Sequence, residues 1–236
     1  MQKLKNIAII LAGGSGNRFA SDLPKQFSKI ENKTILEYSI DAFEQNKQID
    51  EIIVVSNPSF IEKTQEIIQV NSFTKIKAVL GGGKERYHSS LTAINFIENE
   101  CNLIFHDAVR PFVSQQIIDN IIQALSTYNA VNVAVPASDT ILEVTENKNF
   151  IKEIPDRNFL FQAQTPQAFR WSAIKKAYQI GLKDDNFKVT DDCGVVKNYL
   201  PQEAIFVVKG EQTNIKITYP SDIELAKILL NKIKSI

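Results

Sequence analysis

Charged side chains follow glycine-rich stretches at several points of the chain. The first stretch is LAGGSGNRFASDLPKQF, residues 11–27, in which three glycines precede Arg18 and Lys25. Backbone N–H groups of such glycines can approach a phosphate closely, and the two cations add positive charge at the same place. Residues 11–27 therefore favour a phosphate-containing ligand. For this loop alone, a tight turn with two surface cations stays an open alternative.

Two familiar phosphate-binding loops do not fit this stretch. A P-loop has Gly-Lys-Ser/Thr at its end, whereas Asn17 and Arg18 follow Gly16. A dinucleotide-binding loop needs a third glycine where Phe19 stands, counted from Gly14. The sequence thus disfavours a P-loop ATPase and a nicotinamide-dependent dehydrogenase.

Two more stretches carry groups of the same kind. GGGKER, residues 81–86, is a second glycine-rich loop, which alone is weak evidence for a site. HDAVRPF, residues 106–112, places Asp107 at the end of an apolar run, with Arg110 three residues later. Asp107 is a candidate ligand of Mg²⁺, which takes one or two carboxylates and shares its other positions with phosphates and water. A salt bridge between Asp107 and Arg110 is the alternative.

The remaining polar groups favour no general base. TNIKIT, residues 213–218, has an alternating pattern that would turn Lys216 away from the side chains of Ile215 and Ile217. We expect His106 to be a packed, hydrogen-bonded residue, since neither histidine has metal-ligand spacing to a cysteine. A nucleophile that is already an ionised phosphate needs no base, only cations that stabilise charge developing at phosphorus.

Apolar runs and helical patterns alternate along most of the chain. We expect strands at residues 7–13, 50–56, 76–82, 102–108, 130–137 and 204–210, and helices at 34–46, 89–100, 114–128, 171–182, 191–199 and 220–234. The strand segments are almost continuously apolar, which suits a parallel sheet covered on both faces. The alternation predicts an α/β fold with a doubly wound, mostly parallel sheet. Ser114 is the expected N-cap of its helix.

The alternation stops after Pro136. Residues 138–169 have no clear helical pattern, and short strands with polar turns such as ENKN are typical of them. The chain has no linker or internal repeat, so we expect one domain, residues 1–236, with residues 138–163 as a protruding β-arm.

Composition excludes several classes of partner. Lys plus Arg and Asp plus Glu number 27 each, which argues against a general nucleic-acid or membrane-surface binder. No apolar stretch is long enough to cross a bilayer. The two cysteines, Cys101 and Cys193, form no C-x-x-C pattern, and two free thiols are typical of the reducing cytoplasm. We therefore expect a cytoplasmic protein that binds small molecules.

The motifs occur together and in one order. They are LAGGSGNRF, PKQF, GGGKER, HDAVRPF, SDT, DRNFLFQAQTPQAF, VTDD and NIKIT. In this combination the sequence resembles the 2-C-methyl-D-erythritol 4-phosphate cytidylyltransferases and their close relatives, the ribitol-5-phosphate cytidylyltransferases, over nearly the whole chain. The resemblance implies a fold of the nucleotidyltransferase (Rossmann-like) type and a homodimer whose β-arms cross between partners. It also implies CTP as co-substrate and Mg²⁺, or another divalent cation, as cofactor.

The resemblance also implies roles for individual residues. The nucleotide site would comprise Ala12, Gly13, Gly14, Gly16, Gly83 and Ser89. The catalytic cations would be Arg18, Lys25 and Lys216, and Asp107 would be the metal-binding acid. The acceptor would be bound by Asp107, Arg110 and Thr165, and by Thr140 and Arg157 from the other subunit's arm.

The acceptor is the least determined part of this hypothesis. IPDRN, VTDD and QAQTPQAF are typical of the methylerythritol branch, whereas LAGG is common in the ribitol branch. We favour methylerythritol phosphate as acceptor, which gives 4-diphosphocytidyl-2-C-methyl-D-erythritol and pyrophosphate in isoprenoid precursor synthesis. The alternatives are a ribitol-5-phosphate cytidylyltransferase that makes CDP-ribitol for cell-surface polymers and, outside the enzymes, an inactive nucleotide-binding scaffold. The presence of all the loop cations and the metal acid disfavours the scaffold.

Overall fold

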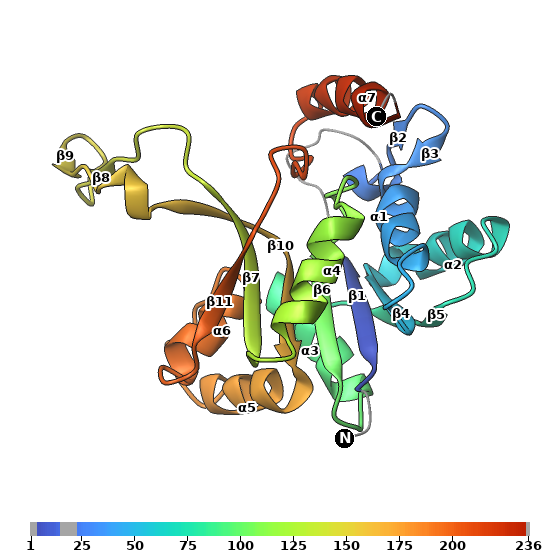
Figure 1. Cartoon of the computed structure of the whole chain (residues 1–236), viewed down its shortest axis with the longest axis horizontal. Coiled ribbons are helices and arrows are strands. Elements are labelled where there is room, and N and C mark those ends of the chain that lie inside the picture. Colours follow the sequence, from blue (N-terminus) through green and yellow to red (C-terminus); the bar gives the residue numbers. More distant parts are fainter. Residues whose placement is uncertain (1–3, 15–22, 235–236) are drawn as a thin grey trace.

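The structure is a computed structural model that describes residues 4–14 and 23–234. Its centre is a seven-stranded sheet with the strand order β11-β7-β10-β6-β1-β4-β5 (Figure 1). These strands are β1 (Asn6–Ala12), β4 (Glu51–Ser56), β5 (Ile76–Gly81), β6 (Asn102–Asp107), β7 (Ala130–Pro136), β10 (Phe161–Arg170) and β11 (Ile205–Lys209). Neighbours are parallel except for β10, which runs antiparallel to β6 and β7. The predicted α/β fold with a mostly parallel sheet is confirmed.

The register of the parallel strands brings the predicted motifs to one edge of the sheet. Leu11 of β1 lies beside Asp107 of β6, and Ala12 lies beside Ser56 of β4. The outer strand β5 ends at Gly81, which pairs with Ser56. Ligands of open α/β sheets bind at the carboxyl ends of the strands. The glycine loop after β1, the GGGKER segment and the HDAVRPF segment therefore meet where a ligand site is expected.

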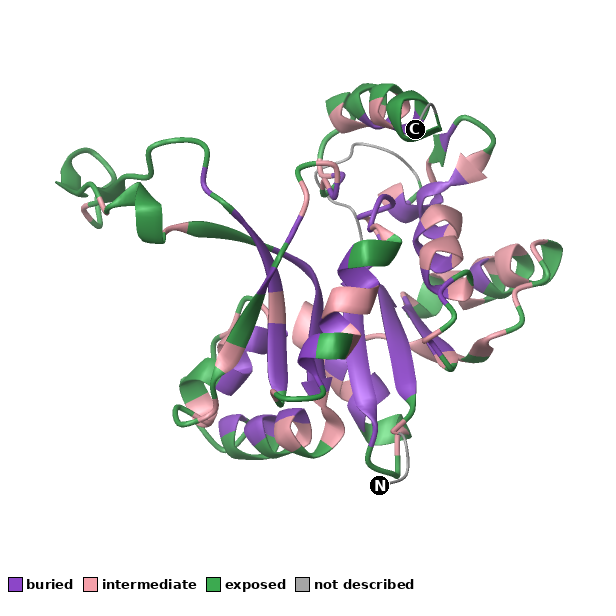
Figure 2. Ribbon diagram, in the orientation of Figure 1, coloured by how far each residue is buried: buried purple, intermediate pink, exposed green. Residues whose placement is uncertain are grey.

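Helices cover both faces of the sheet, and the central strands β1, β4 and β6 are buried almost throughout (Figure 2). The helices are α1 (Ile35–Glu44), α2 (Ile61–Val70), α3 (Arg86–Phe96), α4 (Gln115–Ala124), α5 (Trp171–Gly181), α6 (Asp192–Tyr199) and α7 (Ser221–Lys234). Ala8 and Ile10 of β1 pack in one core with α1 and α4, while Ile7 and Ile9 pack in the opposite core with α3, α5 and α6. Successive side chains of a strand alternate between its faces, so a continuous apolar run serves both cores.

Helix starts agree with the sequence where a clear cap is present. Ser114 caps α4 as predicted, and its hydroxyl accepts a hydrogen bond from the Ile117 N–H at 3.2 Å. By contrast, α3 begins at Arg86, three residues before the predicted start. Helix α2 was not predicted, because it buries only the small polar Thr64 fully and so has a weak apolar pattern.

The segment that carries Lys216 packs beside the HDAVRPF segment under α7. The Ile217 N–H donates to the Val109 carbonyl at 2.9 Å, and Ile217 is fully buried in a small core with Phe112 and Ile215. Lys216 points away from that core, as the alternating pattern predicted, although residues 213–218 form no strand. This segment therefore delivers Lys216 to the edge of the sheet. The short strands β2 (Lys29–Ile30) and β3 (Lys33–Thr34) form a hairpin nearby.

Residues 138–160, here called the arm, leave the sheet between β7 and β10 (Figure 1). The arm carries the strands β8 (Glu143–Val144) and β9 (Ile151–Glu153), which pair with each other, and one 3-10 turn, η3 (Arg157–Phe159). The predicted range 138–163 includes three further residues that belong to β10 and pair with β7. Most of the arm is exposed (Figure 2).

Two other expectations can be compared with the structure. Cys101 and Cys193 are both buried free thiols, as predicted. Within residues 4–14 and 23–234, no helix combines the length and the apolar character that crossing a membrane requires.

Candidate active site

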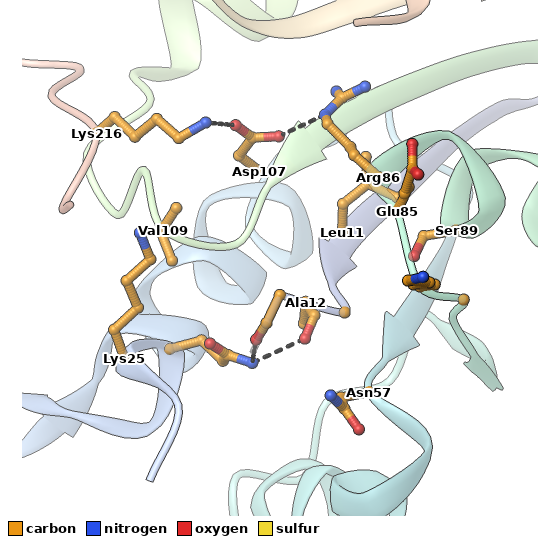
Figure 3. A pocket seen from close by; sticks show the side chains of 15 residues that line it. Leu11, Ala12, Lys25, Asn57, Glu85, Arg86, Ser89, Asp107, Val109 and Lys216 are labelled. Carbon is orange, nitrogen blue, oxygen red and sulfur yellow. Dashed lines mark hydrogen bonds and ion pairs between the residues drawn. The ribbon is translucent and has the colours of Figure 1, made fainter. Parts of the chain in front are cut away.

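A cavity of about 660 Å³ opens at the carboxyl ends of β1, β5 and β6 (Figure 3). Eight residues predicted from the sequence line it: Ala12, Gly13, Gly14, Lys25, Gly83, Ser89, Asp107 and Lys216. Other lining residues, among them Gln26, Asn57, Glu85 and Arg86, were not singled out from the sequence. The structure thus brings five of the six predicted nucleotide residues and two of the three predicted catalytic cations to one concave site, the kind of place where small-molecule ligands usually bind.

A second, smaller cavity of about 190 Å³ shares part of its wall with the first. Arg86, Asp107 and Lys216 border both cavities, so these three side chains stand at the boundary. The smaller cavity adds Arg110 and Thr165, which the sequence assigned to the acceptor, together with Ala163, Gln164, Gln167, Thr190 and Asp191. The predicted acceptor residues that one chain supplies therefore lie next to the predicted nucleotide site.

Two glycine loops close around Ser89 of α3. A Cβ atom at Gly13 would lie 2.8 Å from Ser89 Oγ, and one at Gly82 would lie 2.5 Å from the same atom. A side chain at either position would displace the serine, so only glycine permits both loops to approach it. This close approach leaves backbone groups, rather than side chains, on this wall of the larger cavity.

Gln26 holds the backbone of Ala12 and Gly14 at the end of β1. It is almost fully buried, and its Nε2 donates to the Ala12 carbonyl at 2.8 Å and to the Gly14 carbonyl at 3.2 Å. Lys25 precedes it in the 3-10 turn η1 (Lys25–Phe27) and lines the larger cavity. Gln26 was missed from the sequence, although it stands beside Lys25 in the quoted PKQF motif.

Asp107 is a nearly buried carboxylate held between two cations. Its Oδ1 accepts from Arg86 Nε at 3.2 Å, and its Oδ2 accepts from Lys216 Nζ at 2.7 Å (Figure 3). Burial alone would raise the pKa of Asp107, but Arg86, Lys216 and Arg110 hold that pKa well below its usual range. The carboxylate is therefore ionised at neutral pH. The direct salt bridge with Arg110 considered from the sequence is replaced by these two pairs, because Arg110 is turned to backbone carbonyls.

Arg110 is almost buried and borders the smaller cavity together with Asp107. Its Nη1 donates to the Asn214 carbonyl at 2.7 Å, and its Nη2 makes a longer contact with the Ala163 carbonyl at 3.4 Å. Burial lowers the pKa of Arg110, although Asp107 opposes that effect. An arginine stays protonated through such a shift, so Arg110 adds a fixed positive charge to the smaller cavity.

His106 is a structural link and not a candidate catalyst, as the sequence predicted. Its Nε2 must donate to the Arg110 carbonyl at 2.9 Å, so its Nδ1 accepts from the Thr165 hydroxyl at 3.2 Å. Thr165 Oγ1 in turn accepts from the Asp107 N–H at 3.1 Å. Burial lowers the pKa of His106 to about 4, so the ring is neutral near pH 7. This chain of bonds ties β6 to β10 and fixes the backbone of Asp107.

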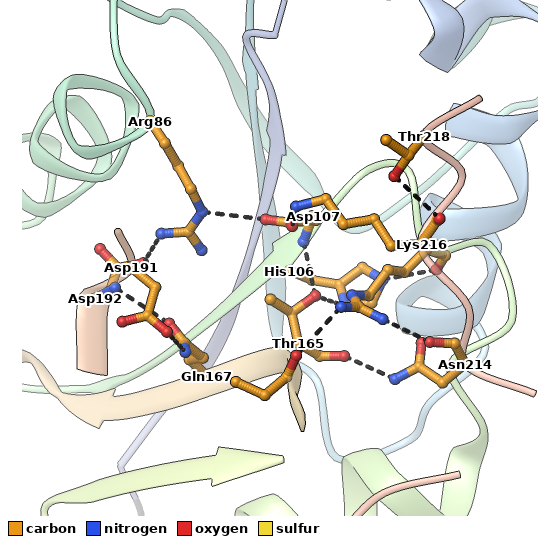
Figure 4. A network of polar contacts seen from close by, with 12 residues as sticks. Arg86, His106, Asp107, Thr165, Gln167, Asp191, Asp192, Asn214, Lys216 and Thr218 are labelled. Atoms are coloured by element: carbon orange, nitrogen blue, oxygen red, sulfur yellow. Dashed lines mark hydrogen bonds and ion pairs between the residues drawn. The ribbon is translucent and has the colours of Figure 1, made fainter. Parts of the chain in front are cut away.

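Arg86 and Asp192 form a further ion pair that the sequence did not predict. Arg86 Nη1 donates to Asp192 Oδ2 at 2.6 Å (Figure 4). Burial opposes the charge of Arg86, yet Asp192 and Asp107 raise its pKa above the ordinary arginine value. Both residues stood in quoted motifs, GGGKER and VTDD, but 106 positions separate them in the sequence.

Four predicted residues are not part of this assembly of described side chains. Gly16 and Arg18 lie outside the described residues. Thr140 and Arg157 are exposed on the arm, and neither borders the two cavities. Arg157 Nη1 donates to the Ser138 carbonyl at 3.0 Å, which is a contact within the arm.

The side chains at the boundary of the two cavities can be assessed as ligands of a divalent cation. Among the described residues, no group of three or more His, Cys, Asp or Glu side chains is placed to hold a metal ion. Asp107 alone offers an ionised carboxylate that borders both cavities. A single carboxylate beside a phosphate site fits Mg²⁺, which fills its remaining positions with phosphate oxygens and water. It does not fit a metal held entirely by protein ligands.

Comparisons with known proteins agree on one family. A family described as IspD, 2-C-methyl-D-erythritol 4-phosphate cytidylyltransferase, matches residues 6–232. A protein of that name from Thermobifida fusca is 40% identical over 94% of this chain and 92% of its own length. Another, from Bifidobacterium longum subsp. infantis, is 39% identical over 98% of this chain and 82% of its own length.

A bifunctional relative has a different name. The Haemophilus influenzae "Bifunctional ribulose 5-phosphate reductase/CDP-ribitol pyrophosphorylase Bcs1" is 45% identical over 96% of this chain. The match covers 48% of that protein, so the present chain spans about half its length.

A solved structure has the same fold. The crystal structure of 4-diphosphocytidyl-2C-methyl-D-erythritol synthase from Anaerococcus prevotii superposes with a TM-score of 0.85 at 30% identity. The superposition covers 97% of this chain and 96% of that one. The likeness therefore extends over the whole architecture described above.

Proposed function

Because the chain belongs to the 2-C-methyl-D-erythritol 4-phosphate cytidylyltransferase family, we propose that it transfers the cytidylyl group of CTP to that polyol phosphate. The products are 4-diphosphocytidyl-2-C-methyl-D-erythritol and pyrophosphate. One observation supports the chemistry above the others. Ionised Asp107 stands with Arg86 and Lys216 at the boundary of two cavities, one lined by glycine loops and one by acceptor residues.

The acceptor's phosphate is the nucleophile. One of its oxygens bonds to the α-phosphorus of CTP, while the bond from that phosphorus to the bridging oxygen breaks and pyrophosphate leaves. The acceptor phosphate is ionised at neutral pH, so no side chain has to remove a proton. Lys25 and Lys216 offset the repulsion between the two anions and stabilise the charge that develops at phosphorus. Arg18 is proposed to act with them.

Asp107 is the residue that would hold Mg²⁺ in this site. The ion would supply Lewis-acid polarisation of the phosphate oxygens and additional positive charge. The residues of this chain perform the rest of the positioning. Backbone groups of Gly13 and Gly14 line the nucleotide side, and Arg110 and Thr165 line the acceptor side.

The arm is proposed to complete the site of a second copy of the chain. Thr140 and Arg157 carry the groups that the acceptor needs, but they lie on the arm and border neither cavity of their own chain. Large apolar side chains of the arm are also exposed, including Phe150 at 67% and Phe159 at 83%. A homodimer in which each arm covers the partner's acceptor cavity accounts for both observations.

The proposed location is the cytoplasm. Both cysteines are buried free thiols, which suits a reducing compartment. The substrates, a nucleotide and a polyol phosphate, are small and anionic.

Pyrophosphate release with CTP and Mg²⁺ tests the function. We expect release with 2-C-methyl-D-erythritol 4-phosphate, and stoichiometric formation of the cytidine diphosphate product. A chain that releases no pyrophosphate with this acceptor, with ribitol 5-phosphate or with another pentitol phosphate would be a nucleotide-binding scaffold.

A second acceptor has one specific observation in its favour. The relative named as a CDP-ribitol pyrophosphorylase is 45% identical, against 39% and 40% for the two relatives named for methylerythritol phosphate. Ribitol 5-phosphate is therefore the second candidate. The same assay distinguishes them through the ratio of kcat/KM for the two acceptors, and we expect that ratio to favour methylerythritol phosphate by at least about tenfold.

A further inference from the structure

Arg86 carries one buried nitrogen that has no hydrogen-bond partner among the described residues. Its Nε donates to Asp107 Oδ1 at 3.2 Å, and its Nη1 donates to Asp192 Oδ2 at 2.6 Å (Figure 4). Nη2, in contrast, is buried without an acceptor in residues 4–14 and 23–234. A buried N–H of a charged group is unfavourable unless it is paired. The geometry therefore leaves one donor of this guanidinium unsatisfied in a side chain that borders both cavities.

The position of Arg86 identifies the chemical class of that ligand. Arg86 borders both cavities, and in the smaller one it shares the wall with Arg110 and Lys216. Three cations and two carboxylates, Asp107 and Asp191, line this cavity of about 190 Å³. The charge of the lining is therefore net positive, which suits a small anionic ligand such as a phosphate. The planar guanidinium binds phosphate oxygens with directed N–H donors, which an ammonium does not offer.

Asp192 binds the guanidinium of Arg86 through Nη1, whereas Asp107 binds it through Nε. The Asp192 carboxylate is fully buried, and its Oδ1 accepts from the hydroxyl of Tyr178, itself buried, at 2.7 Å. The backbone N–H of Asp192 donates to Gln167 Oε1 at 3.2 Å, which joins the start of α6 to β10. Asp192 borders neither cavity, so its carboxylate can affect a ligand only indirectly, through its contact with Arg86.

Stability alone does not explain why Arg86 and Asp192 form a buried ion pair. Replacing a buried ion pair by apolar side chains of similar size is often neutral or stabilising, because burial of the charges offsets their attraction. The buried Asp192 carboxylate is better explained by its effect on the orientation of Arg86. Asp107 and Asp192 hold the guanidinium between them, and together they fix the direction in which Nη2 points.

We propose that Arg86 binds the acceptor's phosphate through Nη2, and that Asp192, held by Tyr178, is the positioning residue for this contact. The inference rests on the proposed function for the identity of the phosphate. It adds Arg86 of α3, Asp192 of α6 and Tyr178 of α5 to the site. None of the three was assigned a role from the sequence.

Steady-state kinetics of the full chain tests the inference. We expect Asp192→Asn to raise the KM for 2-C-methyl-D-erythritol 4-phosphate by about tenfold or more, with the KM for CTP changed by less than about twofold. Arg86→Lys keeps the charge but loses the directed donors, and we expect a rise of the same size. Tyr178→Phe keeps the ion pair, so its rise should be only about threefold.

Asp41→Asn is the matched control. It removes a carboxylate from an ion pair with Lys33 that lies outside both cavities. It should leave both KM values unchanged. Equal rises in the KM for CTP and for the acceptor, or no rise with Asp192→Asn, would overturn the inference. A melting curve shows whether Asp192→Asn folds. If it does not, Tyr178→Phe and Arg86→Lys test the inference in the same way, through a rise in the KM for the acceptor without a rise in the KM for CTP.

Calorimetric titration with inorganic phosphate, without CTP, separates this inference from the proposed function. We expect the wild-type chain to bind phosphate and the Arg86→Lys and Asp192→Asn chains to bind it at least about tenfold more weakly. Equal affinities, or no binding by the wild-type chain, contradict the inference. A chain that releases no pyrophosphate but shows the expected loss of phosphate affinity would refute the function and leave the phosphate contact standing.

Discussion

The two regions that carry the proposed site residues are constructed in opposite ways. At the edge of the sheet, Asp107 and His106 are buried and bonded to residues far away in the sequence. On the arm, Thr140 and Arg157 are exposed, and the hydrogen bond of Arg157 stays within the arm. A single chain therefore brings Asp107, Arg86 and Lys216 together at the edge of the sheet without help from a partner. The arm residues, in our proposal, become ordered parts of a site only against a second chain.

The exposure of apolar side chains also differs between the two regions, being low at the edge of the sheet and high on the arm. The strands β1, β4 and β6 are buried almost throughout, whereas the arm exposes Phe150, Ile151, Ile154 and Phe159 by more than half. Monomeric proteins seldom keep such a cluster in water, because its burial releases about 25 cal/mol per Å². Variants in each region should therefore fail in different ways.

The largest effect is expected at the buried region. Asp107→Asn keeps the shape of the side chain but removes the negative charge between Arg86 and Lys216 and the proposed metal ligand. We expect kcat to fall by about a thousandfold or more, measured as pyrophosphate release at saturating substrates. Asp185→Asn, on an exposed turn, should change nothing. A loss of less than about tenfold would mean that Asp107 does not organise the chemistry.

The cations that border the larger cavity come next. Lys25→Ala and Lys216→Ala should each lower the single-turnover rate by about a hundredfold, because each removes a charge that stabilises the transition state. Lys77→Ala removes an exposed lysine from β5 and serves as the control. If Lys25→Ala cost less than tenfold, its assigned role would be wrong.

A smaller and different effect is expected on the arm. Arg157→Ala should raise the KM for the acceptor by about tenfold and leave the melting temperature unchanged, since the side chain is exposed and its hydrogen bond goes to the Ser138 carbonyl within the arm. Lys152→Ala removes another exposed arm cation, paired with Glu143, and should be silent. A fall in melting temperature with Arg157→Ala would argue that it has a structural role in its own chain.

The smallest effect is the pH dependence of stability that His106 contributes in the buried region. Burial lowers the pKa of His106 to about 4 from an ordinary value of 6.5, so the unfolded chain takes up the proton first as pH falls. The stabilisation is fully present above about pH 6.5 and is lost as pH falls from there to about 4, by about 3 kcal/mol in total. Urea unfolding across this range should show the slope, and His106→Gln should flatten it. An unchanged slope in that variant would assign the pH dependence to other groups.

The edge of the sheet could be predicted because its signal is local. Short apolar runs that end in glycine identify parallel strands, and strands of this kind place their final residues at a common edge. Asp107 and the glycines after β1 were found in this way. Lys216 was assigned through the resemblance, which includes the NIKIT motif, and its alternation with Ile215 and Ile217 survives in the structure without a strand.

The remaining elements depend on packing that no local pattern encodes. The ion pair of Arg86 and Asp192 forms because α3 and α6 lie on the same face of the sheet, and 106 residues separate the two partners. Strand β10 was expected only as part of a segment of short strands and not as a long strand of the main sheet, because Gln162, Gln164 and Gln167 interrupt its apolar pattern. Two of these glutamines bond to Glu211, Asn132 and Asp191 instead of packing in a core.

Mixing two impaired variants tests the central claim, that the buried edge of one chain and the arm of another form one cytidylyltransferase site. Asp107→Asn and Arg157→Ala chains would be unfolded together, refolded and assayed for pyrophosphate release at acceptor concentrations far below KM, where Arg157→Ala alone should keep about a tenth of wild-type activity and Asp107→Asn far less. If each arm serves its partner's site, half of the dimers are mixed and carry one intact site of two, so about a quarter of wild-type activity returns. If each arm serves its own chain, no mixed dimer has an intact site, and activity that stays at the level of the separate variants would contradict the account.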